Sequence, residues 1–156
     1  MDDGVRIRRG EAPDHEWILA LGGRLFDDLG DYREILGHWL QQPRTVALVG
    51  ECEGARCGFA LVAPKREIGF LWRPWMELVA IGTTEATRRR GVGSRLLDAV
   101  VEEAGVRRAQ EIRLHTAVTN QVGHAFFRAR GFQRRSEEGA CYPSGVPAHA
   151  MVRRLG

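Results

Sequence analysis

A short glycine-rich stretch with three arginines, RRRGVGS at residues 88–94, constrains the fold of this chain more than any other segment. It follows a run typical of a strand (residues 76–83) and opens an amphipathic run typical of a helix (residues 94–106). Glycines allow the backbone to turn tightly and to bring its N–H groups close to a ligand. The start of a helix adds N–H donors and the positive end of the helix dipole. The segment therefore predicts a strand–loop–helix unit that binds a phosphate or a diphosphate.

The glycine spacing excludes two common phosphate-binding loops. A nucleotide-binding P-loop separates its glycines by four residues and continues with Lys, whereas a single residue separates Gly91 from Gly93 and no Lys follows. A dinucleotide-binding loop needs a third glycine and belongs to the first strand–helix unit of its domain. The pattern that remains is Arg-x-x-Gly-x-Gly, formed by Arg88, Gly91 and Gly93. Taken alone, this pattern leaves open a tight turn with a solvated basic face.

A second motif, at residues 120–132, follows another strand-like run at residues 112–116. Asn120 suits the N-cap of a helix. Gly131 suits a left-handed C-terminal cap, and Phe132 can fold back onto the helix beyond it. The residues spaced to form one buried helix face are Ala125, Phe126 and Ala129. A capped helix without a ligand explains this segment equally well when it is considered alone.

The two motifs together, in this order and about thirty residues apart, resemble the GCN5-related N-acetyltransferase (GNAT) family. The family's second motif is matched by Asn120, Gly123, Phe127, Gly131 and Phe132. The resemblance implies an α/β fold with a mixed, mostly antiparallel central sheet, helices on both faces and a splayed pair of parallel strands. It also implies a single N-acetyltransferase domain over residues 1–156.

The hydrophobic pattern along the chain predicts the element order β-α-α-β-β-β-α-β-α-β-β, which by itself implies a mixed sheet with helices on both faces. The predicted strands are residues 5–8, 45–49, 57–63, 76–83, 112–116, 132–136 and 148–153. The predicted helices are residues 13–26, 32–40, 94–106 and 120–130. Residues 64–74 give no clear prediction.

The resemblance implies that acetyl-CoA, the acyl donor, lies in the gap between the splayed strands. Its pantetheine would pair with the backbone of residues 81–83, and its diphosphate would accept hydrogen bonds from N–H groups of residues 90–94. The donor-binding residues implied in this way are Ile81, Gly82, Thr83, Arg88, Arg89, Arg90, Gly91, Val92, Gly93, Ser94, Asn120 and Phe127.

Direct attack by an amine requires a proton acceptor, because alkyl amines are charged at neutral pH. Glu77 is the candidate, since some family members carry a general-base glutamate at its spacing from Arg88; a solvent-facing strand residue is the alternative. Many family members have a Tyr where this chain has Phe127, and that hydroxyl protonates the leaving thiolate. Phe127 cannot donate a proton, so Tyr142, near the predicted last hairpin, is the candidate acid. Water or the departing ammonium can also supply that proton.

Acidic and aromatic residues suggest where an acceptor binds. The acidic run between the first two helices consists of Asp27, Asp28, Asp31 and Glu34, and it either attracts a cationic amine or forms a solvated helix end. The tryptophans that either line this pocket or pack the core are Trp39, Trp72 and Trp75. His115 and His124 are expected at the surface.

Composition excludes little and supports a soluble cytoplasmic protein. The net charge of +3 does not demand a nucleic-acid partner, and no aromatic residue interrupts the arginine run. Cys52, Cys57 and Cys141 lack the spacing of a metal site, so no metal is expected. No apolar run approaches twenty residues, so no membrane partner is expected.

The sequence predicts an acetyl-CoA-dependent N-acetyltransferase that acetylates a primary amine of a small molecule or a protein. The first alternative is a coenzyme A-binding regulatory module with little or no turnover, which Phe127 favours. The second is a binder of nucleic acids or acidic surfaces that uses the arginine run. Homodimers are common in the resembled family. The acceptor and the length of the acyl group stay open.

Overall fold

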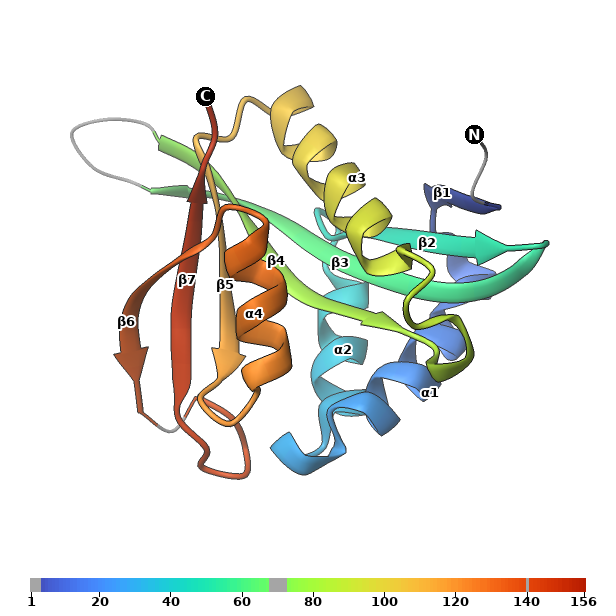
Figure 1. Cartoon of the computed structure of the whole chain (residues 1–156), viewed down its shortest axis with the longest axis horizontal. Coiled ribbons are helices and arrows are strands. Elements are labelled where there is room, and N and C mark those ends of the chain that lie inside the picture. The colour runs from blue at the N-terminus through green and yellow to red at the C-terminus, as the bar shows by residue number, and fades with distance from the viewer. Residues whose placement is uncertain (1–3, 68–72, 140) are drawn as a thin grey trace.

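A computed structural model describes residues 4–67, 73–139 and 141–156, and its described strands form one seven-stranded sheet in the order β1-β2-β3-β4-β5-β7-β6 (Figure 1). The strands are β1 (Val5–Arg9), β2 (Val46–Cys52), β3 (Ala55–Glu67), β4 (Arg73–Thr83), β5 (Glu111–Ala117), β6 (Gln133–Glu138) and β7 (Ala148–Arg154). The pairing of β4 with β5 is parallel and the other pairings are antiparallel. The mixed, mostly antiparallel sheet is therefore confirmed.

Helices cover both faces of the sheet, as predicted (Figure 1). The helices are α1 (His15–Leu25), α2 (Tyr32–Gln41), α3 (Val92–Val106) and α4 (Gln121–Ala129). The apolar side of α3 packs on one face of the sheet through Leu96 and Val100, and α4 adds Phe127 to the same hydrophobic cluster. On the opposite face, Ile18 and Leu36 of α1 and α2 pack against strand residues. Within the described residues, no helix is long and apolar enough to cross a membrane.

The parallel pair is splayed. Only two register positions join β4 to β5, Met76 with Ile112 and Glu77 with Arg113. The register between β3 and β4 then shifts, so that Val79 is an extra residue on β4. A bulge of this kind bends its strand and increases the local twist. The bend lies just after the last residue that β5 pairs with, which accounts for the separation of the two strands.

The second motif forms a capped helix, with a buried face that differs from the predicted one. The N–H of Gly131 donates to the carbonyl of Arg128, and the N–H of Phe132 donates to the carbonyl of Phe127. These two bonds form a Schellman cap, with Gly131 at φ +90°. Phe132 is almost fully buried, and its ring contacts Phe127 edge-on.

The prediction that Ala125 and Ala129 lie on the buried face of this helix was wrong, because both are exposed. Phe127 is buried instead and Phe126 is half-buried. The C-terminal cap explains the difference: Phe132 folds back against Phe127, and this contact turns the adjacent Phe126–Phe127 edge of α4 toward the core.

Two strands, β3 and β4, extend into the segment that the sequence pattern left unassigned. The unassigned residues 64–67 continue β3, and residues 73–75 begin β4. Trp72 lies outside the described residues. β6 begins and ends later than predicted, at Gln133–Glu138, and all its residues are exposed. It is an edge strand, and its charged side chains are typical of edges that resist pairing with other chains.

Candidate active site

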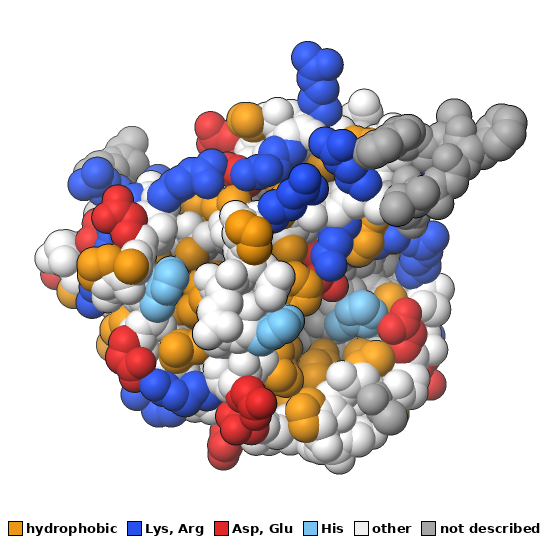
Figure 2. Space-filling view, turned by 180° about the vertical axis from the view of Figure 1, so that it is seen from behind, with side chains coloured by type: hydrophobic (Ala, Val, Ile, Leu, Met, Phe, Trp, Pro, Cys, Tyr) orange, Lys and Arg blue, Asp and Glu red, His pale blue; other side chains and the backbone are white. Residues whose placement is uncertain are grey.

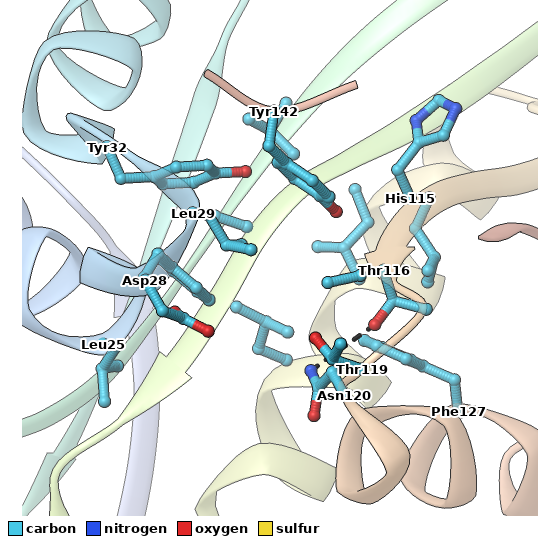
Figure 3. Close-up of a pocket in the computed structure, with 17 residues that line it drawn as sticks. Leu25, Asp28, Leu29, Tyr32, His115, Thr116, Thr119, Asn120, Phe127 and Tyr142 are labelled. Atoms are coloured by element: carbon cyan, nitrogen blue, oxygen red, sulfur yellow. Dashed lines mark hydrogen bonds between the residues drawn. The ribbon is translucent and has the colours of Figure 1, made fainter. Parts of the chain in front are cut away.

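A cavity of about 310 Å³ lies where β4 and β5 separate (Figure 3). Residues 78–81 of β4 form one wall and residues 114–117 of β5 form another. Asn120 and Phe127 close the side toward α4, and Tyr142 joins from the segment before β7. The segment from Leu25 to Tyr32, between α1 and α2, covers the remaining side. The predicted gap between the parallel strands is thus an open space with mixed polar and apolar walls.

The backbone of β4 has a free edge along this gap. Ile81, Gly82 and Thr83 pair with β3 on one side, in register with Ala60, Phe59 and Gly58. On the other side, the recorded pairing with β5 ends at Glu77. Ile81 lines the cavity, and Gly82 and Thr83 continue the strand beyond the lining residues. An extended ligand can therefore hydrogen-bond to this edge as another strand would.

The glycine loop ends at the first turn of α3. Gly91 adopts φ +79°, a left-handed conformation that favours glycine, and precedes the first helical residue, Val92. The side chain of Val92 is buried, so this residue offers a ligand only its backbone. A Cβ on Gly93 would lie 3.3 Å from the ring of Phe126, so the second glycine allows α4 to approach α3 closely. The N–H groups of the first turn have no acceptor within the helix.

The three arginines of the loop are exposed. Arg89 is itself left-handed at φ +72°, and Arg90 lies 3.7 Å from a carboxylate oxygen of Glu53. Arg88 precedes Arg89 in an extended conformation. Ser94 lies in the first turn of α3, half-buried, and its hydroxyl accepts hydrogen bonds from Arg130. Arg130 was missed in the sequence, where it was indistinguishable from the other surface arginines.

Asn120, the N-cap residue of α4, and Phe127 within α4 face the cavity from the side opposite β4 (Figure 3). The Asn120 side chain caps its helix by accepting a 2.9 Å bond from the N–H of Gly123, as the motif predicts. A Cβ at Gly123 would lie 2.4 Å from this side chain, which explains the small residue at that position. Phe127 is almost fully buried between Phe126 and Phe132 and presents only carbon atoms to the cavity.

Glu77 lies just outside the first cavity. It lines two adjoining cavities, a second cavity of about 280 Å³ and a third cavity of about 300 Å³. His115 lines all three cavities. No described residue donates a hydrogen bond to the buried Oε2 atom of Glu77. A buried carboxylate oxygen without a donor is costly, so this atom is suited to accept a proton or an N–H from a ligand.

Two tyrosines face each other across the mouth of the gap (Figure 3). Their ring centroids are 6.4 Å apart, and both rings line the first and second cavities. Burial raises the pKa of Tyr142, and the nearby Tyr32 and Cys141 raise it further. Burial also raises the pKa of Tyr32, with an added contribution from the negative charge of Glu77. Both phenols are therefore protonated at neutral pH and can donate hydrogen bonds.

The histidines differ partly from their predicted surface positions. His115 is exposed as predicted, yet it also lies on the wall of the gap, and its Nε2 is 2.9 Å from Oε2 of Glu138. It lies two residues beyond Arg113, the last residue of β5 that pairs with β4, and no local pattern in the sequence marks this place. His124 is half-buried, and its ring contacts His149 of β7 edge-on. Burial lowers the pKa of His124, and the nearby His149 lowers it further.

Only part of the acidic run reaches the site. The Asp28 carboxylate points into the cavity, whereas Asp31 caps α2 by accepting a bond from the N–H of Glu34 (Figure 3). Trp39 lines the second cavity beside Glu77. Trp75 lines the third and lies under the guanidinium of Arg113, 4.1 Å from its ring centroid.

Comparison with solved structures shows which proteins share this fold. Arabidopsis thaliana NAA60 in complex with acetyl-CoA has a TM-score of 0.79 at 14% identity and covers 97% of this chain and 98% of its own. The ribosomal-protein-S18-alanine N-acetyltransferase from Escherichia coli has a TM-score of 0.77 at 18% identity. The match covers 97% of this chain and 94% of that enzyme. Nourseothricin acetyltransferase has a TM-score of 0.76 at 21% identity, and the match covers 98% of this chain and 99% of that enzyme. These likenesses show a shared fold.

Sequence comparison gives a family. No curated protein sequence matches this chain. The sequence model described as the acetyltransferase (GNAT) family does match, over residues 12–132, which include both motifs and the splayed strands. This match covers well over half of the 156 residues. The chain therefore belongs to the acetyltransferase (GNAT) family.

Proposed function

We propose that this acetyltransferase transfers the acetyl group of acetyl-CoA to a primary amine by direct attack of the amine on the thioester. The observation that carries the proposal is the cavity between β4 and β5, which is open along the free edge of β4 and lies near the first turn of α3. The residues proposed to bind the donor all lie along the edge of β4, at the first turn of α3 or on the wall of the cavity.

The donor would lie along β4. Its pantetheine amides pair with the backbone of Ile81, Gly82 and Thr83, and its diphosphate accepts bonds from N–H groups of residues 90–94. Charge-assisted hydrogen bonds of this kind contribute about 1.5–3 kcal/mol each before desolvation. Asn120 and Phe127 hold the opposite side of the pantetheine. Arg88, Arg89 and Arg90, which are exposed, add attraction that salt weakens.

Proton transfer needs a base for the amine and an acid for the thiolate. In the proposed sequence, Glu77 takes a proton from the ammonium, directly or through one water, and the neutral amine then attacks the carbonyl carbon. When the carbon–sulfur bond breaks, the hydroxyl of Tyr142 protonates the sulfur, and the second proton lost by the new amide nitrogen passes to the phenolate and restores the phenol. Tyr142 is the candidate because it lines the same cavity as Phe127 and remains protonated at neutral pH. His115, which bonds to Glu138, is the second candidate base.

The acceptor amine would enter beside Glu77. The second cavity is lined by the rings of Tyr32, Trp39 and Tyr142 together with Glu77. Aromatic rings and a carboxylate attract an ammonium group through cation–π and charge interactions. Figure 2 shows the face of the molecule opposite to that of Figure 1, where apolar side chains are exposed among polar ones. Two enzymes with this fold are named for their acceptors, an alanine of ribosomal protein S18 in one and the small molecule nourseothricin in the other. Protein amines and small-molecule amines therefore both belong in a test.

The experiment is an amine panel with acetyl-CoA as donor, containing peptides with free N-termini, lysine peptides, polyamines and amino sugars. We expect thiol release that depends on the amine, together with an acetylated product detected by mass spectrometry. The comparisons give no support to a coenzyme A-binding module without turnover. Tight binding of coenzyme A with no product from any amine would nevertheless favour that module over the enzyme.

Several sequence predictions belong to this proposal as well. We propose a single catalytic domain over residues 1–156, a cytoplasmic location, a possible homodimer, and no nucleic-acid or membrane partner. Light scattering coupled to size-exclusion chromatography measures the mass of the assembly, and a titration with oligonucleotides at two salt concentrations tests for nucleic-acid binding.

A further inference from the structure

Arg130, at the C-terminal end of α4, reaches across to the first turn of α3. Its Nε donates to the Ser94 hydroxyl at 3.1 Å, and its Nη2 donates to the same oxygen. Its Nη1 donates to the carbonyl of Phe126 at 3.0 Å. The guanidinium carbon lies 4.0 Å from the centroid of the Phe126 ring. Three donors and a ring face therefore fix the orientation of this side chain.

The charge of Arg130 is not balanced by an acid. None of the described carboxylates lies within ion-pair distance of its guanidinium, which is bonded to a hydroxyl and a carbonyl. Asp14, by contrast, holds Arg8 and Arg56 in short ion pairs. The N-terminus of a helix carries partial positive charge, so a cation beside it is unfavourable unless an anion lies close to both. This pairing of like charges points to an anionic ligand.

We infer that Arg130 and Ser94 together bind the diphosphate of acetyl-CoA from the α4 side, opposite the backbone N–H groups of the glycine loop. The inference rests on the proposed function, because it names two residues of the same donor site. A guanidinium has five N–H groups and Arg130 uses three, so two remain for phosphate oxygens. Both lone pairs of the Ser94 hydroxyl accept from Arg130, so its hydrogen is free to be donated.

Phe126 and Gly93 make this arrangement possible. One side of the Phe126 ring is close to Gly93, and the guanidinium of Arg130 packs on the ring as well. The short distance between α3 and α4 at Gly93 is what allows a side chain from α4 to reach the first turn of α3. The pair would therefore serve binding of the donor, and neither residue would take part in proton transfer.

The test compares Arg130→Gln with Arg128→Gln, which removes an equal charge from an exposed residue of the same helix. Calorimetry measures the Kd for coenzyme A and for 3′-dephospho-coenzyme A at low and high salt. We expect Arg130→Gln to raise both Kd values roughly tenfold and to flatten their salt dependence. Ser94→Ala should raise them less, and Arg128→Gln should leave them unchanged.

Each other outcome has a defined meaning. Equal Kd values for the Arg130 and Arg128 variants, at unchanged melting temperature, would overturn the inference. An effect on coenzyme A that is absent with 3′-dephospho-coenzyme A would also overturn it, because the contact would then be to the 3′-phosphate. If Arg130→Gln unfolds the protein, Ser94→Ala decides the question: unchanged affinity there contradicts the inference. If the wild-type protein binds neither ligand, the proposed function itself fails.

Discussion

Glu77 of β4 and Arg113 of β5 are opposite each other in the last parallel pair of the two strands, and the strands separate immediately beyond them. The candidate base therefore lies where the gap begins. The candidate acid, Tyr142, lies on the wall of the gap, and the two side chains line one shared cavity. An acyl donor lying along β4 would present its thioester between them.

Glu77→Gln tests the base directly. The amide is the same size but cannot take a proton, so we expect kcat to fall roughly 10²-fold while the Kd for coenzyme A stays the same. Steady-state kinetics and calorimetry measure the two quantities. Full activity would exclude Glu77 as the base, and His115→Gln would then show whether the histidine takes its place.

Tyr142→Phe removes only the hydroxyl of a residue that lines the first cavity, as Phe127 does. We expect kcat to fall by roughly tenfold or more, with donor affinity kept. The double change Tyr142→Phe with Phe127→Tyr places a phenol at a different position on the wall of the same cavity. Partial recovery of kcat in the double variant supports a proton-donating role. An unaltered kcat in Tyr142→Phe contradicts it, and leaves the solvent or the departing ammonium as the proton source.

Substitution of either loop glycine by Val should weaken coenzyme A binding strongly, for different reasons. Gly91 is left-handed, and the strain of placing a branched side chain there is roughly 1–2 kcal/mol, which would reshape the turn. A branched side chain at Gly93 would push against Phe126, which supports Arg130. Calorimetry measures both affinities, and Arg89→Gln serves as the control with a smaller effect. Unchanged affinity in the two glycine variants would remove the basis for this donor site.

Asp14 should make the stability of the protein sensitive to acid. The bonds it accepts from Arg8, Arg56 and the N–H of Glu11 lower its pKa well below the ordinary 3.8, despite its burial. Since the folded pKa lies below the unfolded one, this stabilisation is complete above about pH 5 and is lost as the pH falls through the folded value.

Asp14→Asn should lower the free energy of unfolding at pH 7 by about 2 kcal/mol, discounted because the arginines are partly exposed. Urea unfolding at pH 7 and at low pH measures both effects. The difference between wild type and variant should shrink as the pH drops. A constant difference at every pH would show that Asp14 does not act through its charge.

The three cysteines should differ in reactivity. Cys141 is exposed, whereas Cys52 and Cys57 are buried beside each other with their sulfur atoms 2.8 Å apart. Burial raises the pKa of Cys57 to about 12, with further contributions from Cys52. A thiol reagent at neutral pH should therefore modify Cys141 first, and the other two only after unfolding. Rapid modification of all three in the folded protein would contradict this arrangement.

The sequence predicted the fold where local rules decide the structure. The Asn120 cap and the Schellman cap at Gly131 each depend on residues within a few positions of one another, whereas α3 begins at Val92, two residues before its predicted start. Those two caps gave the position of α4, and the resemblance implied the gap between β4 and β5.

The features that were missed depend on contacts between distant segments. The bulge at Val79 is set by the pairing of β4 with β3, and no local pattern marks it. His115 lines the gap because the pairing of β5 with β4 ends two residues before it, at Arg113. Arg130 bonds to Ser94, which is 36 positions away, and a pattern of surface arginines cannot predict that contact. Ala125 and Ala129 were assigned to the core because their spacing was considered without the position of Phe132.

A crystal structure of the protein with acetyl-CoA tests the account most directly. We predict the diphosphate within hydrogen-bond distance of the backbone N–H groups of residues 91–94, with the pantetheine along Ile81–Thr83 and the thioester between Glu77 and Tyr142. A donor bound elsewhere on the molecule, or β4 and β5 paired along their whole length with no gap, would contradict it.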